Sequence, residues 1–144
     1  MANTILDLFE ENPQLVEWRD KVSLLSRQLL MGFSGSSKAV VMASALSEQV
    51  PKILIVTSTQ NEAEQLTGDL SAILGEDKVY SFFADDVSAA EFIFASPEKT
   101  DSRLESLNFL MDKEASGVLV TSLVGTKLYL PNPKVYKDSR IDLA

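Results

Sequence analysis

The chain has 144 residues, the length of one ordinary domain with a single buried core. Apolar residues make up 45% of it and charged residues 24%, which is a globular composition and excludes a disordered chain. The net charge of −8 disfavours binding to the phosphate backbone of DNA or RNA. The absence of Cys and His excludes disulfides, Cys/His zinc sites, cysteine nucleophiles and Ser-His-Asp triads. These counts favour a non-catalytic protein without a metal site.

The charge is unevenly distributed. Residues 1–112 are strongly acidic, whereas residues 113–144 hold slightly more basic than acidic side chains. No apolar run reaches the roughly 18 residues that a membrane-spanning helix requires. The first residues lack the positive charges of a secretory signal. We therefore expect a cytoplasmic protein that does not contact a membrane.

The first predicted element is a helix. Asn12 followed by Pro13 is typical of a helix start. Apolar residues then follow at helical spacing, at Leu15, Trp18, Val22 and Leu25. Residues 28–32 (QLLMG) predict a short buried strand, which leads through a Gly-Ser turn into a helix over residues 38–49.

The middle of the chain alternates strand and helix. Residues 52–56 (KILIV) are typical of a strand that is buried on both faces. Thr59 and Glu62 have the spacing of a capping box, and the helix that they open ends at Gly75. Its inward side chains are predicted to be Leu66, Leu70 and Leu74. Residues 78–83 predict a third strand.

Two helical patterns follow the third strand. Asp85 and Asp86 precede a short one, and with Glu91 they could hold a metal ion. Adjacent carboxylates at a helix start more often cap it, and we interpret this pair as a cap. A longer helix begins at Ser96-Pro97-Glu98. Its inner face is predicted to carry Leu104, Leu107, and Leu110 or Met111.

Strands that alternate with helices of this length predict an α/β fold, a three-layer sandwich with a mainly parallel sheet. Residues 117–121 predict the fourth strand, and a brief helix over residues 123–130 is ended by prolines 131 and 133. The segment over residues 134–144 is polar and β-like, and no strand remains to pair with it. We therefore expect one domain over residues 1–133 and the start of a truncated second domain over residues 134–144.

The turn after the first predicted strand is the strongest candidate for a binding site. A small-residue loop before a helix presents backbone N–H groups that suit phosphate. Against the phosphate-loop pattern G-x-x-x-x-G-K-[ST], Gly32 and Lys38 match, but Ser37 replaces the second glycine and Ala39 replaces the hydroxyl that binds Mg²⁺. The residues of this degenerate phosphate loop are Gly32, Ser34, Gly35, Ser36, Ser37, Lys38 and Ala39.

We expect this loop to bind no cofactor and no metal. No predicted strand is followed directly by a convincing Walker B acid, which a working nucleotide site would also require. The alternative is a divergent phosphate-loop domain that binds or hydrolyses ATP through Lys38 and the loop amides. A third option is a flavodoxin-like binding module of unrelated function.

The order of these segments resembles the N-terminal region of the bacterial transcription-repair coupling factors, the Mfd family, over about residues 14–144. The most specific segments are SRLESLNFL (102–110) and GVLVTSLVGTKLYLP (117–131). The N-terminal module of this family is similar to the first domain (1a) of UvrB but has lost the phosphate loop. Ser37 and Ala39 match that loss. The resemblance therefore implies a UvrB-like α/β domain with a degenerate loop.

The resemblance also implies a role in a larger machine. Members of the family are ATP-dependent DNA translocases that displace stalled RNA polymerase and recruit UvrA for nucleotide excision repair. ATP, Mg²⁺, DNA and RNA polymerase would be bound by other parts of such a parent protein. UvrA would be bound mainly by the second domain, of which residues 134–144 would be only the beginning. The family further suggests that this module docks against its own motor domains.

Overall fold

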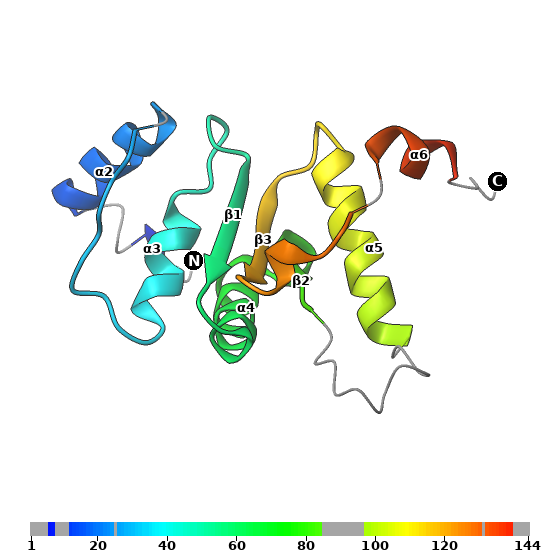
Figure 1. Ribbon diagram of the computed structural model, residues 1–144. Coiled ribbons are helices and arrows are strands. Elements are labelled where there is room, and N and C mark those ends of the chain that lie inside the picture. The colour runs from blue at the N-terminus through cyan, green and yellow to red at the C-terminus, as the bar shows by residue number, and fades with distance from the viewer. Residues whose placement is uncertain (1–5, 8–11, 25, 85–96, 131, 140–144) are drawn as a thin grey trace.

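The core of the protein is a three-stranded, all-parallel sheet in the order β1-β3-β2 (Figure 1). The structure is a computed structural model, and it describes residues 6–7, 12–24, 26–84, 97–130 and 132–139. The strands are β1 (Lys52–Thr57), β2 (Val79–Phe82) and β3 (Gly117–Ser122). The central strand β3 is buried along its whole length.

Helices cover both faces of this sheet. On one face, α4 (Gln60–Leu74) packs Leu66 and Leu70 into a core that also holds Ile55, Val118 and Val120. On the other face, α5 (Pro97–Met111) stacks Phe109 on Tyr80, which stands in register with Leu119 and not with these core valines. Neighbouring residues of a strand point to opposite faces, so the two helices lie on opposite sides. The predicted α/β fold with a parallel sheet is thereby confirmed.

Further short helices lie in the described part of the chain. Among them are α2 (Pro13–Ser23), α3 (Ser37–Ser44), the 3-10 turns η1 (Glu76–Lys78) and η2 (Gly125–Lys127), and α6 (Pro133–Asp138). The start of α2 is as predicted, because the Asn12 side chain accepts a hydrogen bond from the N–H of Gln14. The ends of α4 are as predicted too. The Thr59 hydroxyl accepts from the N–H of Glu62, and Gly75 adopts a positive φ of 93°.

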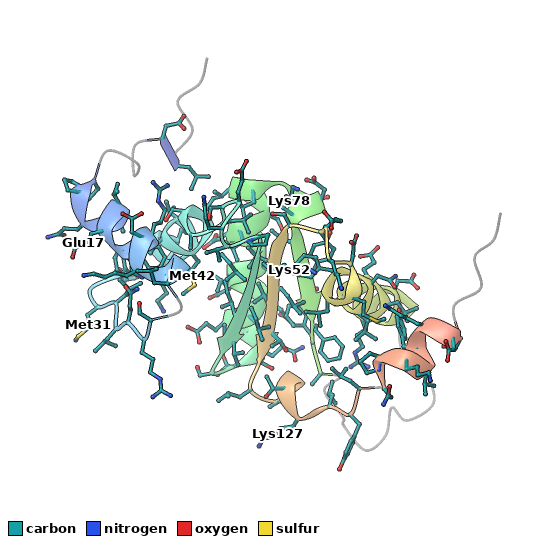
Figure 2. The ribbon with its side chains drawn as sticks, turned by 90° about the horizontal axis from the view of Figure 1, so that it is seen from above. Glu17, Met31, Met42, Lys52, Lys78 and Lys127 are labelled. Atoms are coloured by element: carbon teal, nitrogen blue, oxygen red, sulfur yellow. The ribbon has the colours of Figure 1, made fainter. Side chains whose placement is uncertain are left out.

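The prediction of a strand over residues 28–32 is wrong. These residues form no strand, and Leu29 and Met31 are 83% and 79% exposed. Figure 2 shows Met31 on the segment between α2 and α3, away from the sheet. A strand exists only with a hydrogen-bonded neighbour, which an apolar run by itself does not provide. The helix after it is also shorter than predicted, since α3 ends at Ser44.

The prediction that β1 is buried on both faces is also wrong. Ile55 and Thr57 are buried, but Leu54 and Val56 on the opposite face are 60% and 43% exposed. The reason is its position, because β1 is an edge strand and α5 packs mainly on β2 at the far edge. Lys52 is the part of β1 that reaches α5, where its ammonium group donates to the carbonyl oxygens of Phe109 and Asp112.

The inner face of α5 differs from the prediction. Leu104 and Leu110 are 43% and 46% exposed, Leu107 and Met111 are only partly buried, and the buried side chains are Ser106 and Phe109. The Ser106 hydroxyl lies 2.8 Å from the carbonyl oxygen of Ser81 on β2 and 2.9 Å from that of Ser102. Backbone carbonyls of the sheet therefore select a polar residue for the contact.

Arg103 makes a second polar contact between α5 and the end of β2. Its Nε and one terminal nitrogen donate to the carbonyl of Phe83, at 3.0 and 2.8 Å. The guanidinium group also lies over the ring of Phe82, 5.8 Å from its centroid. These contacts help to hold the face of α5 that carries Ser106 and Phe109 against the sheet. Leu104 and Leu110, on the face predicted from the leucine spacing, therefore remain partly exposed.

The C-terminal part is helical where a β-like segment was predicted. The helix expected over residues 123–130 is reduced to the single turn η2, and Pro133 begins α6 where it was expected to end a helix. The Asn132 side chain accepts from the N–H of Lys134, and the Tyr136 hydroxyl donates to the Asn108 side-chain oxygen of α5 at 3.0 Å. The division at residue 133 stays a prediction.

Two further expectations concern other parts of the chain. The Asp85-Asp86 pair, Glu91 and the short helix predicted after that pair lie outside the described residues. Within the described ranges, no helix has the length and apolar character needed to cross a membrane.

Candidate functional site

The degenerate phosphate loop lies between an exposed segment and the start of α3. Gly32 and Gly35 have positive φ angles of 89° and 56°, which glycine adopts without a steric cost. The Ser37 hydroxyl donates to the carbonyl of Ser34 at 2.6 Å and accepts from its N–H at 3.1 Å. Ser37 occupies the position of the second glycine in the phosphate-loop pattern. Its two hydrogen bonds to the backbone of Ser34 close the turn over residues 34–37.

Lys38 of this loop is paired with a carboxylate of the protein. Its ammonium nitrogen lies 3.4 Å from Oε1 of Glu62, at the start of α4. The Ser58 hydroxyl donates to the other carboxylate oxygen of Glu62 at 2.9 Å. The hydrogen bond from Ser58, and secondarily that from Lys38, lower the pKa of the Glu62 carboxyl. Both partners of the ion pair are exposed to water, so the pair contributes little to stability.

Ala39 is part of the hydrophobic core. Its side chain is fully buried and packs in the cluster that contains Ala63 and Leu66 of α4. A hydroxyl at this position would bind Mg²⁺ in a working phosphate loop, whereas a methyl group cannot. In the described part of the chain, no three Asp or Glu side chains are grouped so that they could hold a metal ion.

A cavity of about 430 Å³ opens beside the loop, at the carboxyl end of β1. Its apolar wall includes Val41 and Met42 of α3, Ile55 of β1 and Leu66 of α4. Lys38, Ser58 and Glu62 supply its polar side chains, and Leu30 and Phe33 approach from the exposed segment. The carboxyl ends of parallel strands are where α/β proteins usually bind ligands. The structure thus places the predicted loop beside the carboxyl end of β1, and the lysine of this loop, Lys38, is paired with Glu62.

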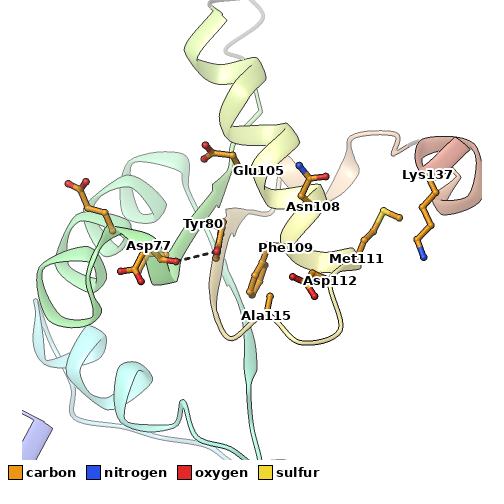
Figure 3. A pocket seen from close by; sticks show the side chains of 11 residues that line it. Asp77, Tyr80, Glu105, Asn108, Phe109, Met111, Asp112, Ala115 and Lys137 are labelled. Atoms are coloured by element: carbon orange, nitrogen blue, oxygen red, sulfur yellow. Dashed lines mark hydrogen bonds between the residues drawn. The ribbon is translucent and has the colours of Figure 1, made fainter. Parts of the chain in front are cut away.

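A second, larger cavity of about 880 Å³ lies near the opposite, amino-terminal end of β2 (Figure 3). The stacked rings of Tyr80 and Phe109, 4.2 Å apart, form part of its wall. Its charged lining is mainly acidic and consists of Glu76, Asp77, Glu105, Asp112 and Lys137. Sequence reasoning missed it, because the lining comes from four separate segments that no spacing connects. Nothing in its geometry indicates a particular ligand.

The described residues form an α/β domain with a parallel sheet flanked by helices, and the loop over residues 32–39 lies beside the carboxyl end of β1. No family model matches the chain, and no solved structure matches it.

The chain is similar to transcription-repair coupling factors. It is 30% identical to that of Bacillus subtilis over 117 residues, which are 81% of this chain and 10% of the relative. It is 25% identical to that of Staphylococcus haemolyticus over 139 residues, 96% of this chain and 12% of the relative. It is 26% identical to that of Staphylococcus epidermidis over 143 residues, which are 99% of this chain and 12% of the relative.

The chain therefore spans about a tenth of the length of the curated relatives that it matches. At 24–30% identity, it is a distant homologue of one region of the transcription-repair coupling factors. This confirms the resemblance at the level of the family.

Proposed function

We propose that this chain is a non-catalytic module of a transcription-repair coupling factor, equivalent to the N-terminal UvrB-like domain of that family. The observation that carries the proposal is the state of the loop. Lys38, the residue that would bind phosphate, pairs with Glu62, and Ala39 is buried where a metal-binding hydroxyl would be needed. The homology over 81–99% of the chain supports the assignment to this family.

The activity of the parent protein then belongs to its other parts. We propose that the parent is an ATP-dependent DNA translocase that displaces stalled RNA polymerase and recruits UvrA. The net charge of −8 on this chain supports a role apart from DNA, because an acidic surface repels phosphate groups. ATP, Mg²⁺, DNA and RNA polymerase would be bound by motor and polymerase-binding domains.

A thermal melting scan with and without millimolar Mg-ATP tests the loss of nucleotide binding. We expect no shift in the melting temperature of the wild-type chain, nor of a Glu62→Gln variant in which Lys38 is released from its ion pair. A bound nucleotide at 100 times its dissociation constant would add about 2.7 kcal/mol of stability. A shift of this size that Lys38→Ala abolishes would contradict the proposal and establish the alternative, a divergent nucleotide-binding domain.

A pull-down with purified UvrA tests where the partner binds. We expect the 144-residue chain to retain little UvrA, and a longer polypeptide of the parent, extended through the whole second domain, to retain it strongly. The reason is that the principal contact would lie beyond Ala144. Equal retention of UvrA by both polypeptides would place the contact within this chain and contradict the proposed division of roles.

A further inference from the structure

The cavity at the amino-terminal end of β2 has an excess of negative charge in its lining. Four carboxylates contribute to it, from Glu76 and Asp77 of η1, Glu105 of α5, and Asp112, which directly follows α5. Among the described residues of the lining, Lys137 of α6 is the one cationic side chain. Within the described part of the chain, none of these five groups has an ion-pair partner within 4.0 Å. Lys137 is therefore attracted by several carboxylates together and not by a single partner.

The helix α6 lies along one side of α5. Glu105, Asn108 and Asp112 are three and four positions apart, so their side chains lie on the same side of that helix. The Tyr136 hydroxyl donates to Oδ1 of Asn108, in the middle of this row, at 3.0 Å. Lys137 is the next residue of α6, and it lines the same cavity as Asn108 (Figure 3). One hydrogen bond thus places the ammonium group of α6 beside the carboxylates.

The attachment of α6 to the rest of the protein is slight. Over residues 132–139, Tyr136 is partly buried and every other residue is exposed. Among the described residues, Tyr136 supplies the side-chain hydrogen bonds between α6 and α5. A helix of six residues is not stable by itself in water. The helical state of α6 therefore depends on the Tyr136 contact and on the attraction between Lys137 and the cavity.

We propose that α6 is an electrostatic clasp on α5, in which Tyr136 sets the position of the helix and Lys137 holds it through the combined attraction of the four carboxylates. These attractions act across water between groups that are not in contact, so dissolved salt screens them. At low ionic strength the clasp is closed, and α6 covers one side of the acidic cavity. At high ionic strength α6 is released and unfolds, and the cavity opens on that side. This inference does not depend on the proposed function.

Cleavage by chymotrypsin after Tyr136 measures the opening of the clasp, because that peptide bond enters a protease only when α6 is released and unfolded. The products are identified by mass spectrometry. The cleavage rate of the full chain is divided by that of a free peptide over residues 130–144 in the same buffer. This ratio removes the effects of salt and of local sequence on the protease itself. Between about 20 mM and about 500 mM NaCl, we expect the ratio to rise about two- to fivefold.

Two lysine substitutions, each made in the chain and in its reference peptide, separate the cavity charge from the charge of α6 in general. Lys137→Gln should raise the ratio at low salt to the value that the wild-type chain reaches at high salt, and the ratio should then no longer respond to salt. The matched control is Lys134→Gln, since Lys134 belongs to the same helix but is not among the described residues that line the cavity. We expect this control to behave like the wild-type chain.

A third variant tests the hydrogen bond separately from the charge. Tyr136→Phe remains a chymotrypsin site, and it should raise the ratio about two- to tenfold at both salt concentrations while the response to salt persists. A wild-type ratio that does not change with salt would overturn the proposal. Equal effects of Lys137→Gln and Lys134→Gln would overturn it as well, because the cavity carboxylates would then have no special part in holding α6.

Discussion

Replacing Phe109 with alanine is expected to lower the free energy of unfolding by about 3–5 kcal/mol. Its side chain is 3% exposed, stacks on the Tyr80 ring and lies under the ammonium group of Lys52, 4.9 Å from the ring centroid. Removing the ring leaves a cavity between α5 and β2 and removes the ring's contacts with Tyr80 and with the Lys52 ammonium group. Urea unfolding followed by circular dichroism measures the difference.

Leu110→Ala is the matched control, since it removes the neighbouring apolar side chain of the same helix. We expect it to cost less than about 1 kcal/mol, because nearly half of Leu110 is already exposed to water. If Leu110→Ala proved as costly as Phe109→Ala, the leucine face predicted from spacing would be the buried one and the packing of α5 would have to be reversed.

Gly117→Ala is expected to cost about 1–3 kcal/mol, through overpacking at the first residue of β3. A Cβ at this position would lie 2.5 Å from the carbonyl oxygen of Lys78 and 3.2 Å from Cε2 of Tyr80. The carbonyl belongs to the backbone next to β2, so it cannot move aside without shifting the strand pair. Thermal unfolding with van't Hoff analysis measures the loss.

Gly68→Ala is the control for the glycine substitution itself. Gly68 lies on the exposed side of α4, and no atom would approach its Cβ within 4 Å. Alanine there should add about 0.5–1 kcal/mol of stability, because it restricts the unfolded chain and favours the helix. If both glycine variants were equally stable, the close approach of Gly117 to Lys78 would be disproved.

The sequence alone determined the features that depend on local chemistry. Asn12 and Thr59 cap their helices, and Gly75 ends α4 with the positive φ that its position required. Three apolar runs became the three strands of a parallel sheet. Ser37 and Ala39 departed from the phosphate-loop pattern, and this was readable without any structure because that chemistry depends on residue types at fixed spacing.

Tertiary structure decided everything that depends on what lies next to an element. The spacing of Leu104, Leu107 and Leu110 predicted one face of α5, but the carbonyls at β2 selected Ser106 and Phe109 instead. The pairing of Lys38 with Glu62 joins residues 24 positions apart, which no motif spacing connects.

Residues 28–32 show the same limit for a strand. Their apolar composition is that of a buried strand, yet they are exposed and, among the described residues, pair with no strand of the sheet. The physical reason is that a cap or a turn is satisfied by atoms a few residues away, whereas burial and strand pairing are satisfied only by surfaces that folding brings together.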